Sequence, residues 1–190
     1  MSTCRDGVFA FTIGLVLLGT AAFSCAFAEM TMEVGGAPMD SSKDIIENVS
    51  NSKDHTTFVA ALKAADLIET LQGEGPFTVF APVDRAFEKL PKGTIEVLLR
   101  PENKPALIAA LTHHIIPGRI SAADFIAAIK KGGGEATYQT LEGEKLTVRQ
   151  DERRIEITDA EGNKAIVMVA DVVQKNGVMH IVDKVLLPKR

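Results

Sequence analysis

The feature that most constrains this chain is a charge-free apolar run near its start. No charged residue occurs from Gly7 to Ala28, and the run ends Ala26-Phe27-Ala28 before Glu29. Small residues flanking a larger one in this way are typical of the cleavage site of a secretory signal peptide. We therefore predict a signal peptide over residues 1–28 and an exported protein, either periplasmic or at the cell surface. The run is also long enough to span a bilayer, so a retained membrane anchor is the alternative.

The two cysteines add a second constraint, because Cys4 and Cys25 both lie in this leader. The rest of the chain can form no disulfide and no catalytic thiolate, so its core alone must stabilise it. A length of roughly 160 residues suits one domain that buries about 70% of its chain surface. We expect a flexible arm over residues 29–42, where no periodicity is sustained, and a domain over residues 43–190.

Apolar spacing divides this domain into a helical first half and a strand-rich second half. Helical spacing recurs up to residue 131, with Asp54, Thr94 and Ser121 as expected N-caps. After the three glycines at 132–134, apolar segments joined by polar turns predict an antiparallel meander. Asn176-Gly177 predicts a hairpin turn, because both residue types tolerate positive φ. Helices followed by strands indicate an α+β fold.

The stretch FTVFAPVDRAF (Phe77 to Phe87) reads as a buried strand that stops abruptly. Proline removes a ladder donor and pushes the residue before it away from helical angles, so the strand must end near Ala81. Asp84 follows and is expected to accept the free amides of its own helix. We interpret the stretch as a structural joint rather than a catalytic turn, with Arg85 solvated.

The four histidines are the residues most able to carry chemistry. His113 and His114 are adjacent, so their side chains point in different directions, and no spacing typical of metal ligands surrounds them. His180, between apolar neighbours, is expected to be buried and hydrogen-bonded, and His55, near a helix start, to be exposed. A metal- or small-ligand-binding envelope enzyme that uses His113, His114 and His180 is the alternative that this reasoning leaves open.

Other catalytic signals do not appear in the sequence. There is no nucleophile elbow and no phosphate loop, and a formal net charge of -4 gives no basic face for nucleic acid. The sequence therefore favours a protein that is not an enzyme, needs no cofactor or metal and does not bind nucleic acid. Asn48-Val49-Ser50 fits the glycosylation sequon.

Three segments in order resemble the fasciclin domain family. FTVFAPVDRAF is similar to its first signature block, LTHHIIPGRI falls where the family has a Tyr-His pair, and DVVQKNGVMHIVDKVLLP is similar to its second block. The likeness covers residues 43–188 and is greatest to exported bacterial single-domain members, related to beta-Ig-H3-like adhesion modules. It implies an α+β fold with a β-sandwich or wedge of about seven strands and a layer of helices. It also implies adhesion without catalysis or cofactor.

The resemblance assigns motif positions that we expect to be mainly structural and to meet in the core. They are Thr78, Phe80, Pro82, Asp84 and Phe87 in the first block, and Asp171, Asn176, Gly177, His180, Asp183, Val185, Leu186 and Pro188 in the second. Two positions depart from the family pattern. Val83 replaces a Thr or Ser, and His113 replaces the Tyr of the pair that is associated with adhesion in animal relatives.

The candidate interaction residues follow from the same resemblance. They are the His113-His114 pair and Asp44-Ile45, which resembles an Asp-Ile adhesion motif of animal relatives. The expected function is an exported interaction or cell-adhesion module that binds a surface protein or glycan. It would contact a membrane only if the leader is retained.

Overall fold

The structure is a computed structural model that describes residues 32–189. The predicted signal peptide, the possible anchor and residues 29–31 of the predicted arm lie outside the described residues. Within residues 32–189, no helix is both long enough and apolar enough to cross a membrane.

Seven strands form one strongly curved sheet in the order β4-β3-β9-β8-β7-β6-β5. They are β3 (Phe77–Pro82), β4 (Ile115–Pro117), β5 (Glu135–Gln139), β6 (Lys145–Asp151), β7 (Arg154–Thr158), β8 (Lys164–Gln174) and β9 (Gly177–Val182). Neighbours pair antiparallel except β3 and β9, which are parallel. The meander from β5 to β9 confirms the strand-rich second half. Register shifts in β8 between Val167 and Val172 interrupt its pairing with β9, and such bulges bend a strand.

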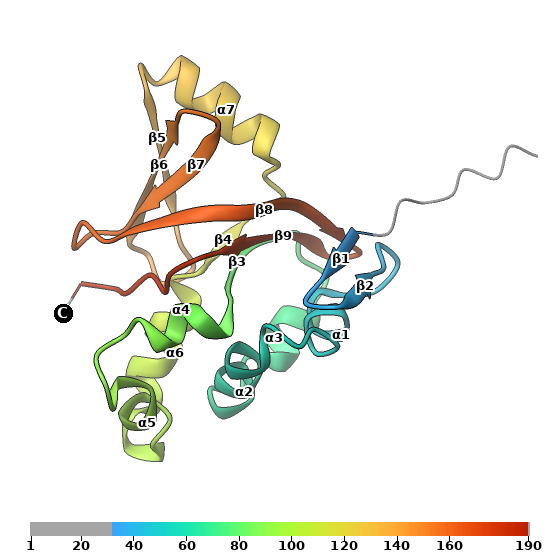
Figure 1. Cartoon of the computed structure of the whole chain (residues 1–190), viewed down its shortest axis with the longest axis vertical. Coiled ribbons are helices and arrows are strands. Elements are labelled where there is room, and N and C mark those ends of the chain that lie inside the picture. Colours follow the sequence, from blue (N-terminus) through green and yellow to red (C-terminus); the bar gives the residue numbers. More distant parts are fainter. Residues whose placement is uncertain (1–31, 190) are drawn as a thin grey trace, which may run out of the picture. The chain divides into compact units, whose positions relative to one another are not determined.

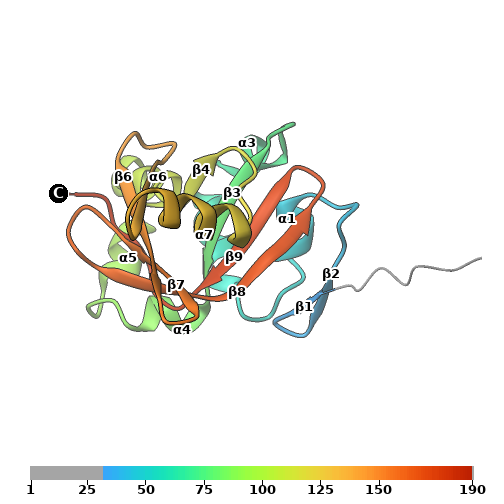
Figure 2. The ribbon, with the colours of Figure 1, turned by 90° about the horizontal axis from the view of Figure 1, so that it is seen from above.

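Helices cover this sheet unequally, as Figure 1 shows. They are α1 (Ile45–Val49), α2 (Thr56–Ala64), α3 (Ile68–Gln72), α4 (Asp84–Glu88), α5 (Thr94–Leu98), the 3-10 turn η1 (Pro101–Asn103), α6 (Lys104–Thr112) and α7 (Ala122–Lys131). Helices α1 to α6 gather on the side of β3 and β9 away from β5–β7, whereas α7 lies over the curved part of the sheet (Figure 2). The predicted α+β class, with about seven strands and a helical layer, is confirmed.

Two hydrophobic cores result, and the central strands contribute to both. Val79 and Ala81 of β3 pack with the helices, while Phe80 between them packs with Phe125 of α7 and with the meander. Side chains alternate across a strand, so a strand buried on both faces must be apolar throughout, as in parallel sheets. Every residue of β9 is buried for this reason.

The prediction of a flexible arm up to residue 42 is wrong for the described part of that segment. β1 (Met32–Val34) and β2 (Ala37–Met39) form a hairpin whose turn glycines, Gly35 and Gly36, have φ of +59° and +72°. Val34, Ala37 and Met39 are buried in the core shared with α1 and α2. Apolar burial therefore orders a segment whose local composition suggests a loop.

Two of the three predicted N-caps also differ from the structure. The helical spacing of residues 55–71 is divided between α2 and α3 near Asp66, whose φ is +56°, and His55 rather than Asp54 occupies the N-cap position of α2. Gly93, with φ of +85°, takes the N-cap position expected for Thr94. In contrast, Ser121 caps α7 as predicted, in a capping box with Asp124.

Candidate functional site

The two signature blocks lie side by side in the sheet, on its second and third strands counted from the β4 edge. β3 carries the first block and β9 the second, and their register pairs Phe80 with His180 and Pro82 with Val182. The expectation that the blocks meet in the core is confirmed. Thr78 stitches β3 to the segment before α7, since its Oγ1 donates to Gly118 O at 2.7 Å and accepts from Ile120 N at 2.9 Å.

Asp84 caps a different helix from the one we predicted. Its carboxylate accepts from Thr57 N at 2.8 Å, from Thr56 Oγ1 at 2.7 Å and from Thr56 N at 3.3 Å, so it serves the start of α2 rather than that of α4. Burial pushes the pKa of Asp84 upward, but the hydrogen bonds from Thr56 and Thr57 outweigh it and leave the pKa lowered. Such a carboxylate is charged and structurally committed. Arg85 beside it is exposed, as predicted.

Asn176 fastens two helix ends to the sheet. Its Oδ1 accepts from Ile45 N at 3.1 Å, and its Nδ2 donates to Leu71 O at 2.6 Å and to Gly73 O at 3.1 Å. The hairpin was predicted correctly, but its reason was wrong, because neither Asn176 nor Gly177 has positive φ. A Cβ on Gly177 would lie 2.1 Å from Phe77 O. Glycine is needed there for the close approach of the neighbouring strand.

His180 is a core residue, as predicted. Its Nδ1 accepts from Asp171 N at 3.3 Å, and its Nε2 donates to Ile120 O at 3.0 Å. Its ring packs between Phe80 and Phe125, with centroids 5.8 and 5.4 Å away. Burial lowers the pKa of His180, although the Ile120 carbonyl partly opposes this, so the ring is neutral and bound.

Both aspartates of the second block accept backbone amides. Asp171, with φ of +59°, accepts from Ala122 N at 2.7 Å. Asp183 accepts from Ile166 N at 2.7 Å and pairs with Lys89 Nζ at 3.2 Å. Pro188 lies in the extended segment that follows β9. Asp171 and Asp183 thus connect β8 and the segment after β9 to neighbouring backbone.

The adjacent histidines point to different surroundings. His114 Nδ1 donates to Ala110 O at 2.8 Å, and Nε2 accepts from Leu186 N at 3.0 Å; burial lowers the pKa of His114 to about 4. His113 is buried 3.7 Å from Glu144 Oε2, and neither of its ring nitrogens has a hydrogen-bond partner among residues 32–189. Burial also lowers the pKa of His113, against the opposing charge of Glu144.

His55 is buried, contrary to the prediction, with Nδ1 2.8 Å from Ser52 Oγ. Burial lowers the pKa of His55, against the opposing charges of Asp54 and Asp84. In the described part of the chain, no three His, Cys, Asp or Glu side chains are placed to hold a metal. The alternative of a metal enzyme requires His113, His114 and His180 to form one metal site. Among residues 32–189 they form no such site.

Three of the four candidate interaction residues have almost no surface to offer a partner. Ile45 and His113 are 0% exposed and His114 is 1% exposed. Asp44 is partly exposed, but it caps α1 in a capping box with Glu47. The interaction role predicted for Ile45, His113 and His114 is therefore wrong, because their side chains are buried and cannot contact a partner. The glycosylation sequon is also buried: Asn48 is 1% exposed, and its Nδ2 donates to Asp40 O and Gln174 Oε1, so this side chain is not accessible to a glycan.

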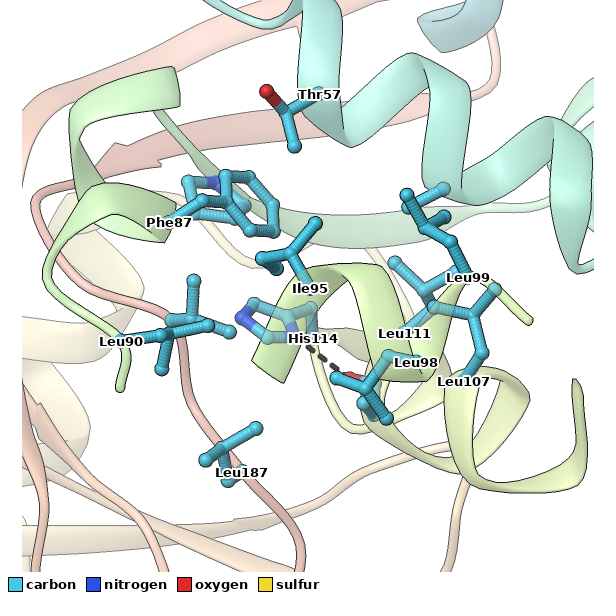
Figure 3. A pocket seen from close by; sticks show the side chains of 14 residues that line it. Thr57, Phe87, Leu90, Ile95, Leu98, Leu99, Leu107, Leu111, His114 and Leu187 are labelled. Carbon is cyan, nitrogen blue, oxygen red and sulfur yellow. Dashed lines mark hydrogen bonds between the residues drawn. The ribbon is translucent and has the colours of Figure 1, made fainter. Parts of the chain in front are cut away.

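His114 also lines an apolar pocket among α2, α4, α5 and α6 (Figure 3). We call it the helical pocket; Phe87, Ile95, Leu98, Leu107, Leu111 and Leu187 are among the side chains around it. Its free volume is about 20 Å³, room for about one water-sized group. None of the five residues of α5, which covers it, is buried.

A second, open site lies where both blocks reach the surface. We call it the motif groove; it has a volume of about 580 Å³ and is lined by Asp54, Val83, Asp84, Arg85, Lys89, Met168 and Asp183. Met168, on β8, is 51% exposed. Sequence reasoning missed this groove, because β8 meets the first block only in the folded domain.

Comparison with known proteins fits this geometry. The family model described as "Fasciclin domain" matches residues 53–188. "Protein sll1483" of Synechocystis is 42% identical over 178 residues, which are 94% of this chain and 91% of that protein. "Immunogenic protein MPB70" of Mycobacterium bovis is 31% identical, with 92% of this chain and 82% of that protein covered. Human periostin is 34% identical over 71% of this chain, but only 15% of periostin is covered.

A solved structure shares the fold. A domain pair from the insect cell adhesion molecule Fasciclin I matches with a TM-score of 0.68 and 18% identity, covering 76% of this chain and 51% of that one. The chain belongs to the fasciclin domain family, and the resemblance inferred from its motifs is confirmed.

Proposed function

We propose that this chain is an exported, non-enzymatic module that binds a protein or glycan partner through the motif groove, at the cell surface or in the periplasm. The observation that carries the proposal is that both signature blocks open onto this one groove. Two of its three carboxylates already serve the fold, since Asp84 caps α2 and Asp183 accepts from Ile166 N. Arg85 and Met168 are exposed and left for a partner.

The chemistry of the groove suits a modest, repeated contact. It combines one exposed apolar side chain with charges of both signs, and exposed ion pairs contribute little each. Such contacts gain strength when many copies act together, which is how an adhesion module on a surface operates. Membership of the fasciclin family, with relatives that include a protein named a cell adhesion molecule, supports this reading.

Beads coated with the purified chain test the proposal directly. They would be offered to immobilised envelope proteins, to immobilised glycans and to whole cells, with beads coated with the Arg85→Glu variant as the matched control. We expect saturable capture by at least one surface, and at least tenfold less with the variant. Equal capture by both bead types would contradict the proposal.

Export is tested separately by the N-terminal sequence of the protein recovered from envelope fractions. We expect the recovered protein to start at Glu29. A retained leader in the membrane fraction would mean that the protein is tethered to the membrane and not released.

A further inference from the structure

The chain after β9 is held by side chains rather than by a neighbouring strand. We call residues 184–189 the C-terminal strap. Leu186 N donates to His114 Nε2 at 3.0 Å, Leu187 N to Asp159 Oδ2 at 3.2 Å, and Lys189 N to Glu144 at 3.1 Å. No residue of the strap belongs to a helix or strand. Its attachment therefore depends on the protonation state of the groups that accept its amides.

His114 can accept the hydrogen bond from Leu186 N in only one protonation state. Its Nδ1–H is used by Ala110 O at 2.8 Å, so Nε2 must stay unprotonated to accept from Leu186 N. A proton on Nε2 would turn an acceptor into a donor that faces another donor. The side chain of Leu186, 0% exposed, would then be held without its amide bond.

The strap also closes the helical pocket. Val185 and Leu187 line that pocket beside His114, and Figure 3 shows Leu187 on the side of the pocket formed by the chain's last segment. Leu186, between them, packs in the other core with Phe125 and Val182. Release of the strap would therefore uncover the pocket and remove a side chain from the second core.

We propose that the C-terminal strap is a proton-operated latch on the helical pocket, in which protonation of His114 at Nε2 releases the amide of Leu186. The inference concerns opening of the strap and stands whether or not the pocket holds a ligand.

The charges around His114 set the direction of the effect. His113 lowers the pKa of His114 and the charge of Asp159, which accepts from Leu187 N, raises it, while Glu144, Asp159 and Glu142 raise the pKa of His113. Burial lowers the pKa of His114 to about 4 with the strap closed, from the value of 6.5 that an exposed imidazole has. Opening the strap removes part of that burial, so protons favour the open state as the pH falls, and the opening equilibrium should rise by up to about 30-fold between pH 7.5 and pH 5.

Amide hydrogen exchange tests the latch in the full chain, between pH 7.5 and pH 5, a range that stays above the titration of free carboxyl groups. The protection factors of Leu186 and Leu187 should fall by more than about threefold and by up to about 30-fold, while those of β9 stay higher at every pH. His114→Gln keeps an acceptor and a donor but does not titrate, so its strap protection should fall less than about threefold. An equal fall in the variant, or a fall only in step with β9, would overturn the proposal.

A measurement on the unaltered chain covers the case in which the variant does not fold. The imidazole signal of His114 and the amide signal of Leu186 should change with one common midpoint. Separate midpoints would mean that the strap does not respond to this histidine, and the proposal would fall.

Discussion

Asp84 Oδ1 accepts a hydrogen bond from Thr57 N at 2.8 Å, so a residue two positions beyond β3 caps the start of a helix 27 positions earlier in the chain. Helix α2 has no side-chain cap of its own, because His55 occupies the N-cap position. The joint between strand and helix is thus also a clasp between the helical layer and the sheet, with the motif groove beside it.

Removing this clasp should destabilise the domain. Asp84→Ala deletes a cap and a favourable charge at a helix N-terminus, and we expect the free energy of unfolding to fall by about 1–2 kcal/mol. Arg85→Ala, one residue away on the exposed side, should change it by less than about 0.5 kcal/mol. Urea denaturation of both variants checks this. Similar losses in the two would argue against the clasp.

The polar hub at Asn176 should matter more. Asn176→Ala leaves Ile45 N, Leu71 O and Gly73 O without this partner in a buried region, at an expected cost of about 3 kcal/mol. Asn51→Ala removes an exposed hydrogen bond to Glu47 O and should cost less than about 1 kcal/mol. Thermal unfolding of the pair decides, and a mild effect at Asn176 would mean that water replaces the lost bonds.

Gly177 provides a test of close packing rather than of turn geometry. Gly177→Ala would place a Cβ 2.1 Å from Phe77 O, and we expect a loss of about 3 kcal/mol or more because backbone must move. Gly143→Ala, at φ of +102° with open space around it, should lose only about 1 kcal/mol. A loss at Gly177 no larger than the loss at Gly143 would contradict the claim that close contact with Phe77 O requires glycine at 177.

Acid should weaken the whole domain through its histidines. The pKa values of His55, His113, His114 and His180 are all lowered from 6.5, first of all by burial. The stability that comes from keeping these rings neutral is present above pH 6.5 and is lost as the pH falls below it. For His114 alone the loss approaches about 3 kcal/mol near pH 4. Urea midpoints at pH 7.5, 6 and 5 that do not decrease would refute this.

Local signals were sufficient for much of the fold. The capping box of Ser121 and Asp124 lies within four residues, and polar turns between apolar segments predict the meander. The meeting of the two blocks in the core could be inferred because both were recognisable as signatures, whereas the parallel pairing of β3 with β9 could not. Each of these features depends on neighbours in sequence or on a pattern already known from relatives.

The remainder depends on partners far along the chain. Asp84 caps α2, and Asn176 bonds to Ile45 N across 131 positions. The hairpin at residues 32–39 packs on a core that later segments form. Burial of His55 has the same origin. The motif groove and the helical pocket combine elements in the same way, so no single segment of sequence carries either site.

Met168 and Val173 offer the most direct test of the account. Both lie on β8, and they are 51% and 46% exposed, but only Met168 lines the motif groove. Beads that carry Met168→Glu should lose at least tenfold of the capture shown by the unaltered chain, while Val173→Glu should leave it unchanged. Equal capture by the two variants would contradict the claim that this fasciclin domain binds its partner through the groove between its signature blocks.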